Sequence, residues 1–566
     1  MSTLVVPGVR VEAQFDVLPP LPAPSGIIGI AGVVDRPPVT TRLIGVSKVS
    51  ELKQLIGPGT IHSMKEAVHA LSNGASEVIV SAVSGGSAAI LTLLNEDSVP
   101  AVLLKCRFNR KWADKLSAEV RTIRDALGNI VRVTLYLIVD GAAVETFPDL
   151  RVAPGQPDDL FDTINQKSNL VVALDAGFQN ALPAEGTYIF DAPGTPINVL
   201  VDGDTSTLFQ LLPKEDAEPD GLRAVLTVSD STSTINIKVY RGAALQEELA
   251  GLTMNPDSDL YLPFVLLAKS SLIRIRAASS LAAGKRLPTA TSGPVIFTDG
   301  TSPGANDYND AIDLLTEDPR IDLICASIEP ARADNEVIQI HQSLVAHAVK
   351  MADDGSPCIA FGSVTPTEAA SLDKIKDHAS AVRNRRFVLI APSRAEGAVA
   401  GMVGRMNPKE SPTFKTVPLF DINPSSYRES ELNRLLSSTT NLLVVQERAG
   451  RGIVVLRALN TIGDQISVTR VADKAIRETK AISENFIGQL NSEDARTALK
   501  QQIFATLTRM EREGAIVPST DGKDPAFIVD VYSTQQDFAQ GIVRIDIAIR
   551  PVRAIDYIYA TIRVKN

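Results

Sequence analysis

Three glycines near the N-terminus have a spacing that could cradle a phosphate. Gly26, Gly29 and Gly32 approach the pattern of a dinucleotide-binding loop, which binds pyrophosphate through backbone amides at the start of a helix. These glycines lie inside an apolar run with no helix start behind them, so the required amides are missing. The chain also lacks a Gly-x-x-x-x-Gly-Lys-Ser/Thr phosphate loop and a Gly-x-Ser-x-Gly nucleophile elbow. We therefore predict no cofactor.

Residues that could bind a metal or exchange protons are scarce. Of the five histidines, His341 and His347 lie six positions apart on a predicted helix, which puts them on different faces. Cys106, Cys325 and Cys358 form no C-x-x-C pair. We interpret the histidines as solvent-facing or hydrogen-bonded and the cysteines as reduced, buried thiols. We predict no metal site and no catalytic residues.

The elements that would position a site are those of an α/β protein. After residue 295, strands alternate with helices, as in the strand at 321–328 and the helix at 336–353. This order predicts βαβ crossovers and a mainly parallel sheet. The apolar run at 26–34 predicts another core strand, whereas 88–294 is rich in strands and turns. We expect a discontinuous α/β core, of mixed α/β class, interrupted by one or two β-rich insertions.

The predicted domains follow these changes of pattern. Prolines at 19–24 predict a semi-rigid linker, and 468–513 is helical with a break at Asn491–Ser492, where Ser492 and two acidic residues favour a helix start. The predicted parts are an N-terminal arm and linker at 1–25, a first core part at 26–87, β-rich inserted domains at 88–294, a second core part at 295–540 and C-terminal strands at 541–566.

At the front, residues 4–13 have the pattern of a short extended arm, and at the back the chain alternates apolar and polar side chains, the pattern of a half-buried strand. A terminal strand can add to the sheet edge of a neighbour because no second loop holds it. We expect pairing between subunits, with pairing inside the same domain as the alternative. Gly541–Ile549 has the same pattern. The predicted inter-subunit strand residues are Leu4, Val5, Val6, Val9 and Val11 at the front and Tyr557, Ile558, Tyr559, Ile562 and Val564 at the back.

The composition argues against several classes of protein. The net charge of -10 disfavours a nucleic-acid binder, which normally carries a basic face, and the single Trp leaves few platforms for base stacking. Hydrophobic residues make up 44% of the chain, yet no apolar run is long enough to span a membrane. The N-terminus lacks the pattern of a secretory signal, so we expect synthesis in the cytosol.

The order of segments resembles the contractile tail sheath family. Pro7–Glu12 is similar to the opening arm of that family, and Gly29–Pro38 is similar to its first core strand and turn. Further likeness lies at Ala311–Leu315, Gly450–Leu459 and Gly541–Ile558, the last of which resembles the C-terminal strands. The resemblance covers both ends and the α/β core, whereas the insertion is only loosely matched.

This resemblance implies a structural subunit and not an enzyme. Sheath subunits stack in rings around a tail tube and shorten to drive the tube through a cell envelope. The implied partners are further copies of the chain, the tail tube protein, and baseplate and tail terminator proteins, with no direct nucleic-acid contact and no membrane insertion. The implied location is the contractile tail of a virion assembled in the host bacterial cytoplasm. Lys474, Arg477 and Lys480 are candidate tube contacts, or else an ordinary solvated helix face.

Two other interpretations stay open. An α/β enzyme with a β-rich insertion would have a defined pocket with perturbed titratable groups. The sheath of a non-viral contractile injection system would share the features of a phage sheath, and the sequence does not separate the two.

Overall fold

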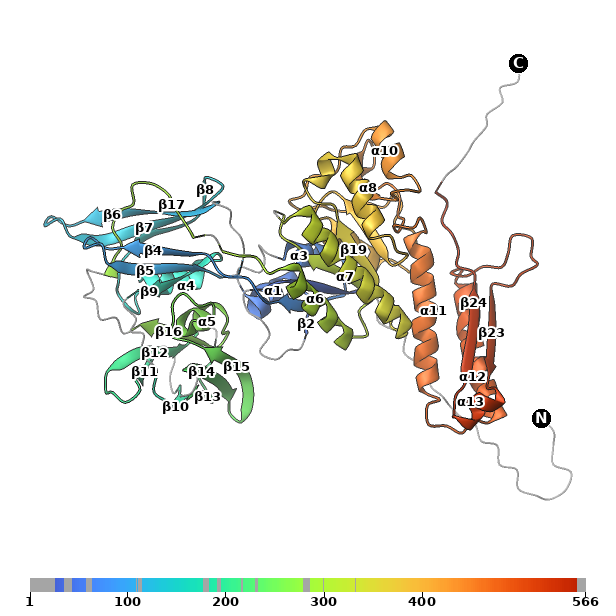
Figure 1. The fold of residues 1–566 in the computed structure, drawn as a ribbon, viewed down its shortest axis with the longest axis horizontal. Helices are drawn as coiled ribbons and strands as arrows, with labels where there is room; N and C mark the ends of the chain where they lie inside the picture. The colour runs from blue at the N-terminus through green and yellow to red at the C-terminus, as the bar shows by residue number, and fades with distance from the viewer. Residues whose placement is uncertain are drawn as a thin grey trace, which may run out of the picture. The chain divides into compact units, whose positions relative to one another are not determined.

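The structure is a computed structural model of the 566-residue chain, shown in Figure 1. The described residues form two compact units, one comprising 467–554 and the other comprising 26–466 with 555–556. The structure describes residues 26–34, 43–57, 64–107, 109, 115–176, 183–190, 195–214, 217–229, 233–277, 286–298, 300–330 and 332–556.

An eight-stranded sheet forms the core of the larger unit (Figure 1). Its strands are β1 (Ile27–Val33), β2 (Ile44–Val46), β3 (Glu77–Val83), β18 (Leu323–Ser327), β19 (Ile359–Ser363), β20 (Phe387–Ala391), β21 (Leu443–Arg448) and β22 (Gly452–Val455). They are ordered β2-β3-β1-β18-β19-β20-β21-β22. Neighbours from β3 to β21 are parallel, and the edge strands β2 and β22 are antiparallel. Strands from both sides of the insertion share this sheet, which confirms the predicted discontinuous α/β core.

Helices cover both faces of the sheet. They are α1 (Val49–Ile56), α3 (Lys65–Ser72), α6 (Ala305–Leu314), α7 (Asp334–Asp353), α8 (Leu372–Ala381), α9 (Glu396–Arg405) and α10 (Glu429–Leu435). On one face, Val399 of α9 belongs to the same buried cluster as Ile28, and on the other, Ile340 of α7 belongs to the same cluster as Ile27. Every residue of β18, β19 and β20 is therefore buried, as expected of parallel strands covered on both sides.

The insertion consists of four antiparallel sheets and two short helices within the described residues. Sheet β4-β5-β9 and sheet β17-β6-β7-β8 accompany α4, and sheet β11-β12-β16 and sheet β10-β13-β14-β15 accompany α5. The bounds are β4 (Ile90–Leu94), β5 (Pro100–Cys106), β6 (Leu116–Arg124), β7 (Ile130–Val139), β8 (Ala142–Leu150), α4 (Leu160–Lys167), β9 (Val171–Asp175), β10 (Gly186–Ile189), β11 (Ile197–Leu200), β12 (Thr207–Pro213), β13 (Leu222–Ser229), β14 (Thr234–Arg241), β15 (Ala244–Leu252), α5 (Leu262–Ala268), β16 (Ile273–Ala277) and β17 (Val295–Ile296).

The smaller unit packs two long helices against a hairpin. Its elements are α11 (Ile466–Glu484), α12 (Glu493–Arg512), β23 (Phe527–Tyr532), α13 (Gln535–Ala539) and β24 (Arg544–Ile549). Val471 of α11, Ile503 of α12 and Phe527 belong to one buried cluster. The predicted helix break is confirmed, because Ser492 caps α12 by accepting a hydrogen bond from the amide of Ala495 (3.1 Å).

Candidate assembly surface

The smaller unit carries a sheet of only two strands among the described residues. β23 and β24 pair antiparallel, with Val529 opposite Ile547. Gly541–Ile549, expected from its alternation to be a strand, therefore pairs within its own chain over 544–549. No other described strand pairs with either outer edge. A two-stranded sheet is marginally stable by itself, so this hairpin depends on what packs against it.

The inner face of the hairpin is unevenly covered. On β23, Phe527 and Val529 are buried against the cluster that includes Leu499 and Ile503 of α12. On β24, the side chains that face the same cluster are only half-buried, and the exposed face of β23 includes Ile528, which is 59% exposed. The half-buried residues of β24 are Ile545, Ile547 and Ile549.

Backbone groups of the same β24 residues face away from β23. The amide of Arg550 donates to the carbonyl of Ala526 (2.9 Å), whereas the amide of Val531 donates to the carboxylate of Asp530 (3.0 Å). In an antiparallel pair, inward and outward backbone groups alternate along each strand. The β24 residues whose amides face outward are therefore Ile545, Ile547 and Ile549. The β24 edge thus presents both hydrogen-bonding groups and incompletely covered apolar side chains.

An ion pair fixes the connection between the two strands. Thr534 caps α13 by accepting from the amide of Asp537 (3.1 Å). The guanidinium of Arg544, at the start of β24, donates to both carboxylate oxygens of Asp537 (2.9 and 2.8 Å). The Arg544 hydrogen bonds lower the pKa of Asp537 strongly. This bidentate contact holds the start of β24 in place.

An apolar groove lies beside the hairpin. It is lined by the turn after α11, the start of α12 and the residues before and within β24. Ile487 and Leu490 in the turn are 80% and 87% exposed, which is uncommon for large apolar side chains in one short segment. The period-2 alternation that predicts strands does not detect an exposed apolar turn. The two large apolar residues between the predicted helices could have indicated one.

The predicted tube-contact residues lie on α11 in the smaller unit. Lys474 forms ion pairs with Glu513 (3.4 Å) and Glu478 (3.9 Å), and Arg477 and Lys480 are partly exposed. The carboxylate of Glu478 also contacts Arg509 (3.1 Å). The structure therefore brings Lys474 into a charge network between α11 and α12 and does not test its role toward a tube.

The predicted inter-subunit strand residues lie outside the described residues. These are Leu4, Val5, Val6, Val9, Val11, Tyr557, Ile558, Tyr559, Ile562 and Val564. Their pairing stays a prediction.

The polar groups of the α/β core form buried networks. Nδ1 of His341 lies 2.9 Å from Nε2 of His378, and Nδ1 of His378 lies 2.8 Å from a carboxylate oxygen of Glu368. Burial lowers the pKa of His341 well below its usual range and that of His347 to about 4. His341 is hydrogen-bonded, as predicted, whereas His347 is buried with an Nδ1 that has no partner.

No metal or membrane site emerges from the residues that the structure describes. They contain no group of three His, Cys, Asp or Glu side chains placed to hold a metal ion. None of their helices has the length and hydropathy needed to cross a membrane.

Known structures resemble the chain at low similarity. The sheath tail protein from Desulfitobacterium hafniense is 12% identical, with a TM-score of 0.46 and coverage of 97% of both chains. The sheath tail protein from Listeria innocua is 12% identical, with a TM-score of 0.45 and coverage of 95% of this chain and 94% of that chain. The helical sheath of the anti-feeding prophage in its contracted state is 18% identical, with a TM-score of 0.35 and coverage of 48% and 78%.

A family match identifies the region that contains the hairpin. No curated protein matches the chain. The family model described as phage tail sheath C-terminal domain matches residues 461–565, which include α11, α12, β23 and β24. Residues 461–565 are therefore similar to the phage tail sheath C-terminal domain, in agreement with the resemblance of the chain's ordered segments to contractile tail sheath proteins.

Proposed function

We propose that this chain is a subunit of a contractile tail sheath. It stacks in rings around a tail tube, and shortening of the stack drives the tube through a cell envelope. The observation that carries the proposal is the β24 edge, which lies inside the matched sheath domain and presents outward amides beside half-buried isoleucines. The role is structural, with further copies of the chain as the main partner.

Strand addition would complete the hairpin. An extended segment from a neighbour that lies along β24 would satisfy the outward backbone groups and cover the half-buried side chains. The apolar terminal segments at 4–11 and 557–564 have the composition for this pairing. A hairpin in each subunit and a donor strand at each end would link the rings into a continuous mesh.

A linked mesh can shorten without breaking. The Pro-rich linker at 14–25 separates the front strand from the core, so a subunit can rotate while its donated strand stays paired. The contracted state must then be lower in free energy, by on the order of a few kcal/mol per subunit summed over many copies. Calorimetry that detects neither heat release nor a stability gain on contraction would contradict this energy source.

The remaining partners follow from the same arrangement. The α/β core would face the tube and the insertion would face outward, with baseplate and terminator proteins at the two ends of the stack. Lys474, Arg477 and Lys480 stay candidates for the tube contact. Lys474 already pairs with Glu478 and Glu513, so a tube carboxylate would have to replace one of these partners. Tails assembled in the bacterial cytoplasm, of phages or of injection particles, would contain such a sheath.

The test uses two substitutions at one position of the full chain. Ile547→Pro removes an outward-facing amide of β24 and leaves the hydrogen bonds to β23 intact. Ile547→Ala removes side-chain contacts of the same residue and keeps the amide. Negative-stain electron microscopy, with the cognate tube protein added if needed, should show tubes or ring stacks for the wild type and for Ile547→Ala, and discrete particles for Ile547→Pro.

Folding controls keep this result interpretable. Circular dichroism melting should give the same main transition for both Ile547 variants, because the α/β core is a separate compact unit. Deletion of residues 1–13 should also abolish tubes. Tubes formed by Ile547→Pro as readily as by Ile547→Ala would contradict strand addition on β24, and a wild type that stays discrete with its tube protein would contradict the sheath proposal itself.

A further inference from the structure

The insertion contains the same fold twice. A first module at 90–175 and a second at 197–277 each consist of five strands, a short helix and a sixth strand, in that order along the chain. The three-stranded sheets β4-β5-β9 and β11-β12-β16 correspond, as do the runs β6-β7-β8 and β13-β14-β15. The fourth strands of the two larger sheets, β17 and β10, lie outside the two modules. Identical topology in adjacent segments is the mark of a tandem repeat.

Strand registers of the two modules correspond at a fixed spacing. Val133 pairs with Leu150 between β7 and β8, and Ile235 pairs with Leu252 between β14 and β15. The second pair follows the first by 102 positions (235 − 133 and 252 − 150). Both irregularities in the pairing of β7 with β8 recur in β14 and β15 at this spacing.

A side-chain contact recurs at the same spacing. Glu145 accepts hydrogen bonds from Oγ of Ser168 (2.6 Å) and from the amide of Asn169 (2.9 Å). Glu247 accepts from Oγ of Ser270 (2.6 Å) and from the amide of Ser271 (2.6 Å) in the same way. Each glutamate thus links the second strand of a hairpin, β8 or β15, to the residues at the end of the following helix, α4 or α5. The modules therefore share both backbone and side-chain construction.

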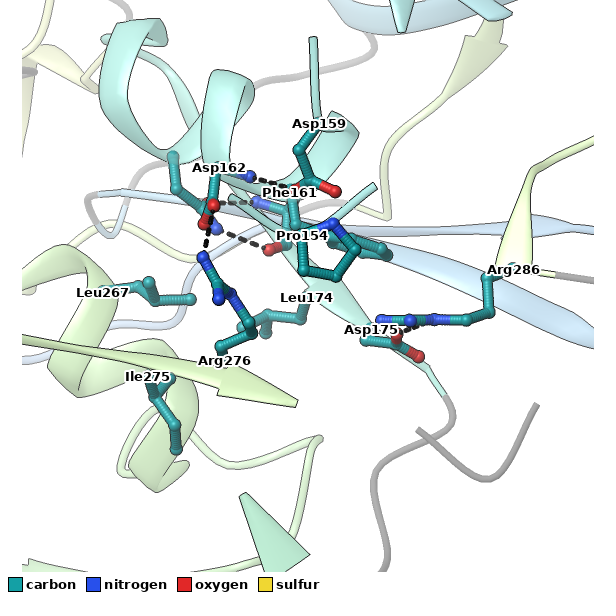
Figure 2. Close-up of a pocket in the computed structure, with 12 residues that line it drawn as sticks. Pro154, Asp159, Phe161, Asp162, Leu174, Asp175, Leu267, Ile275, Arg276 and Arg286 are labelled. Atoms are coloured by element: carbon teal, nitrogen blue, oxygen red, sulfur yellow. Dashed lines mark hydrogen bonds and ion pairs between the residues drawn. The ribbon is translucent and has the colours of Figure 1, made fainter. Parts of the chain in front are cut away.

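The two modules meet along a seam formed by α4 and β9 of the first and α5 and β16 of the second (Figure 2). At one end, Asp162 of α4 pairs with Arg276 (2.8 Å) and with Arg274 of β16. Side chains of all three are at most 16% exposed. At the other end, α5 packs against β9. The enclosed space is about 20 Å³, room for about one water molecule, so the seam is an interface and not a ligand pocket.

Equivalent positions at the two ends of the seam differ in chemistry. By the 102-residue spacing, Asp162 corresponds to Phe264 of α5. Arg274 and Arg276 of β16 correspond to Val172 and Leu174 of β9. A helix thus lies against a strand twice, α4 with β16 and α5 with β9. The first contact joins a carboxylate to two arginines, whereas at the second the ammonium of Lys105 lies over the ring of Phe264 (4.8 Å).

We propose that this seam is a recognition surface that pairs a first module with a second module and rejects a second copy of itself. Two first modules would place Asp162 against Val172 and Leu174, which leaves a buried carboxylate without a cation. Two second modules would place Phe264 against the paired arginines. The fully buried Lys105 of β5 adds a second contact specific to this pair of modules, because it forms an ion pair with Asp259 of the second module (3.2 Å). In an assembly that crowds many copies of the insertion together, this difference favours the correct pair.

The test compares two variants of the full chain that differ at one residue. Arg274→Val with Arg276→Leu leaves Asp162 buried and without its cations, so the seam should open. Adding Asp162→Phe gives this end the residues that occupy the equivalent positions of the other end, Phe264 with Val172 and Leu174, so the seam should close again. Hydrogen exchange of the α4 amides should be about 100-fold faster in the double variant and should return to within about tenfold of wild type in the triple variant.

An exposed pair in the second module provides the matched control. Lys238 and Glu248 lie 3.0 Å apart and are 43% and 41% exposed. Exchanging them, as Lys238→Glu with Glu248→Lys, should leave the α4 exchange unchanged. Wild-type exchange in the double variant would show that the ion pairs do not hold the seam. An open seam in the triple variant with an unchanged melting transition would show that the modules are not equivalent. Either outcome overturns the proposal.

Discussion

The eight-stranded sheet and the β23–β24 hairpin differ in how completely one chain covers them. Helices bury both faces of β18, β19 and β20, and the described edge strands of this sheet are short. The hairpin is covered on one face, and its β24 isoleucines stay half-buried. The eight-stranded sheet is thus covered within a single chain, whereas the hairpin leaves one edge unpaired among the described residues and its apolar side chains partly exposed. Substitutions should therefore act on folding in the core and on assembly at the hairpin.

The largest expected effect is a substitution at Gly401 in α9. A Cβ at this position would lie 2.3 Å from the carbonyl oxygen of Ala70 in α3, and backbone cannot move away as a side chain can. Gly401→Val should lower the free energy of unfolding by about 3 kcal/mol or more, measured by urea denaturation. Ser380→Val, on the exposed face of α8, should change it by less than about 0.5 kcal/mol. Equal effects of the two substitutions would show that helix packing in the core is loose.

A smaller effect should depend on pH and arises from Glu396 at the start of α9. This carboxyl is buried, and one of its oxygens has no hydrogen-bond partner. Burial and the nearby Glu66 raise the pKa of Glu396 to about 7, from 4.5. Between these values the folded chain keeps a proton that the unfolded chain has released. The stability linked to Glu396 is therefore fully present below pH 4.5 and is lost as the pH rises to about 7.

Glu396→Gln should remove this dependence. Relative to wild type, the variant should gain about 2 kcal/mol of stability between pH 5 and pH 8, measured by urea denaturation at both values. His341 and His347 have lowered pKa values, so their contribution is lost in the opposite direction, as the pH falls below about 6.5. Both variants contain these histidines, and the difference between the two curves isolates Glu396. Stability curves of wild type and Glu396→Gln that run parallel against pH would contradict a raised pKa of Glu396.

The sequence was sufficient to predict the core, because its signals are local. Continuous apolar runs such as Phe387–Ala391 indicate buried parallel strands, and Ser492 with two acidic residues indicates a helix start. The alternation in 544–549 indicated a strand with one apolar face. It did not indicate that this face is incompletely covered, because coverage depends on α12, which is distant in sequence.

The seam of the insertion was missed for a related reason. Asp162 and Arg276 are 114 positions apart, so no local pattern joins them. A signal was present at longer range, because Pro154 and Pro256, and Lys167 and Lys269, are identical at the 102-residue spacing. Comparison of the insertion with itself would have detected the repeat. The packing of its two modules and the ion pairs of their seam depend on the folded arrangement.

The smallest expected effect is on the surface of the hairpin. Lys500 of α12 and Asp530 of β23 form an ion pair of 3.2 Å, with side chains that are 45% and 61% exposed. Because water and salt screen such a pair, Lys500→Ala should change the unfolding free energy of the isolated chain by less than about 1 kcal/mol, and the difference should vanish in high salt. In assembled tubes, a strand added along β24 would lie at the edge of the hairpin away from β23, so this pair should stay in water. Lys500→Ala should then leave unchanged the salt concentration at which tubes dissociate, measured by sedimentation, as should exchange of the solvated pair of Lys238 and Glu248, whereas a lower value for Lys500→Ala alone would indicate that the added strand contacts β23 and not β24.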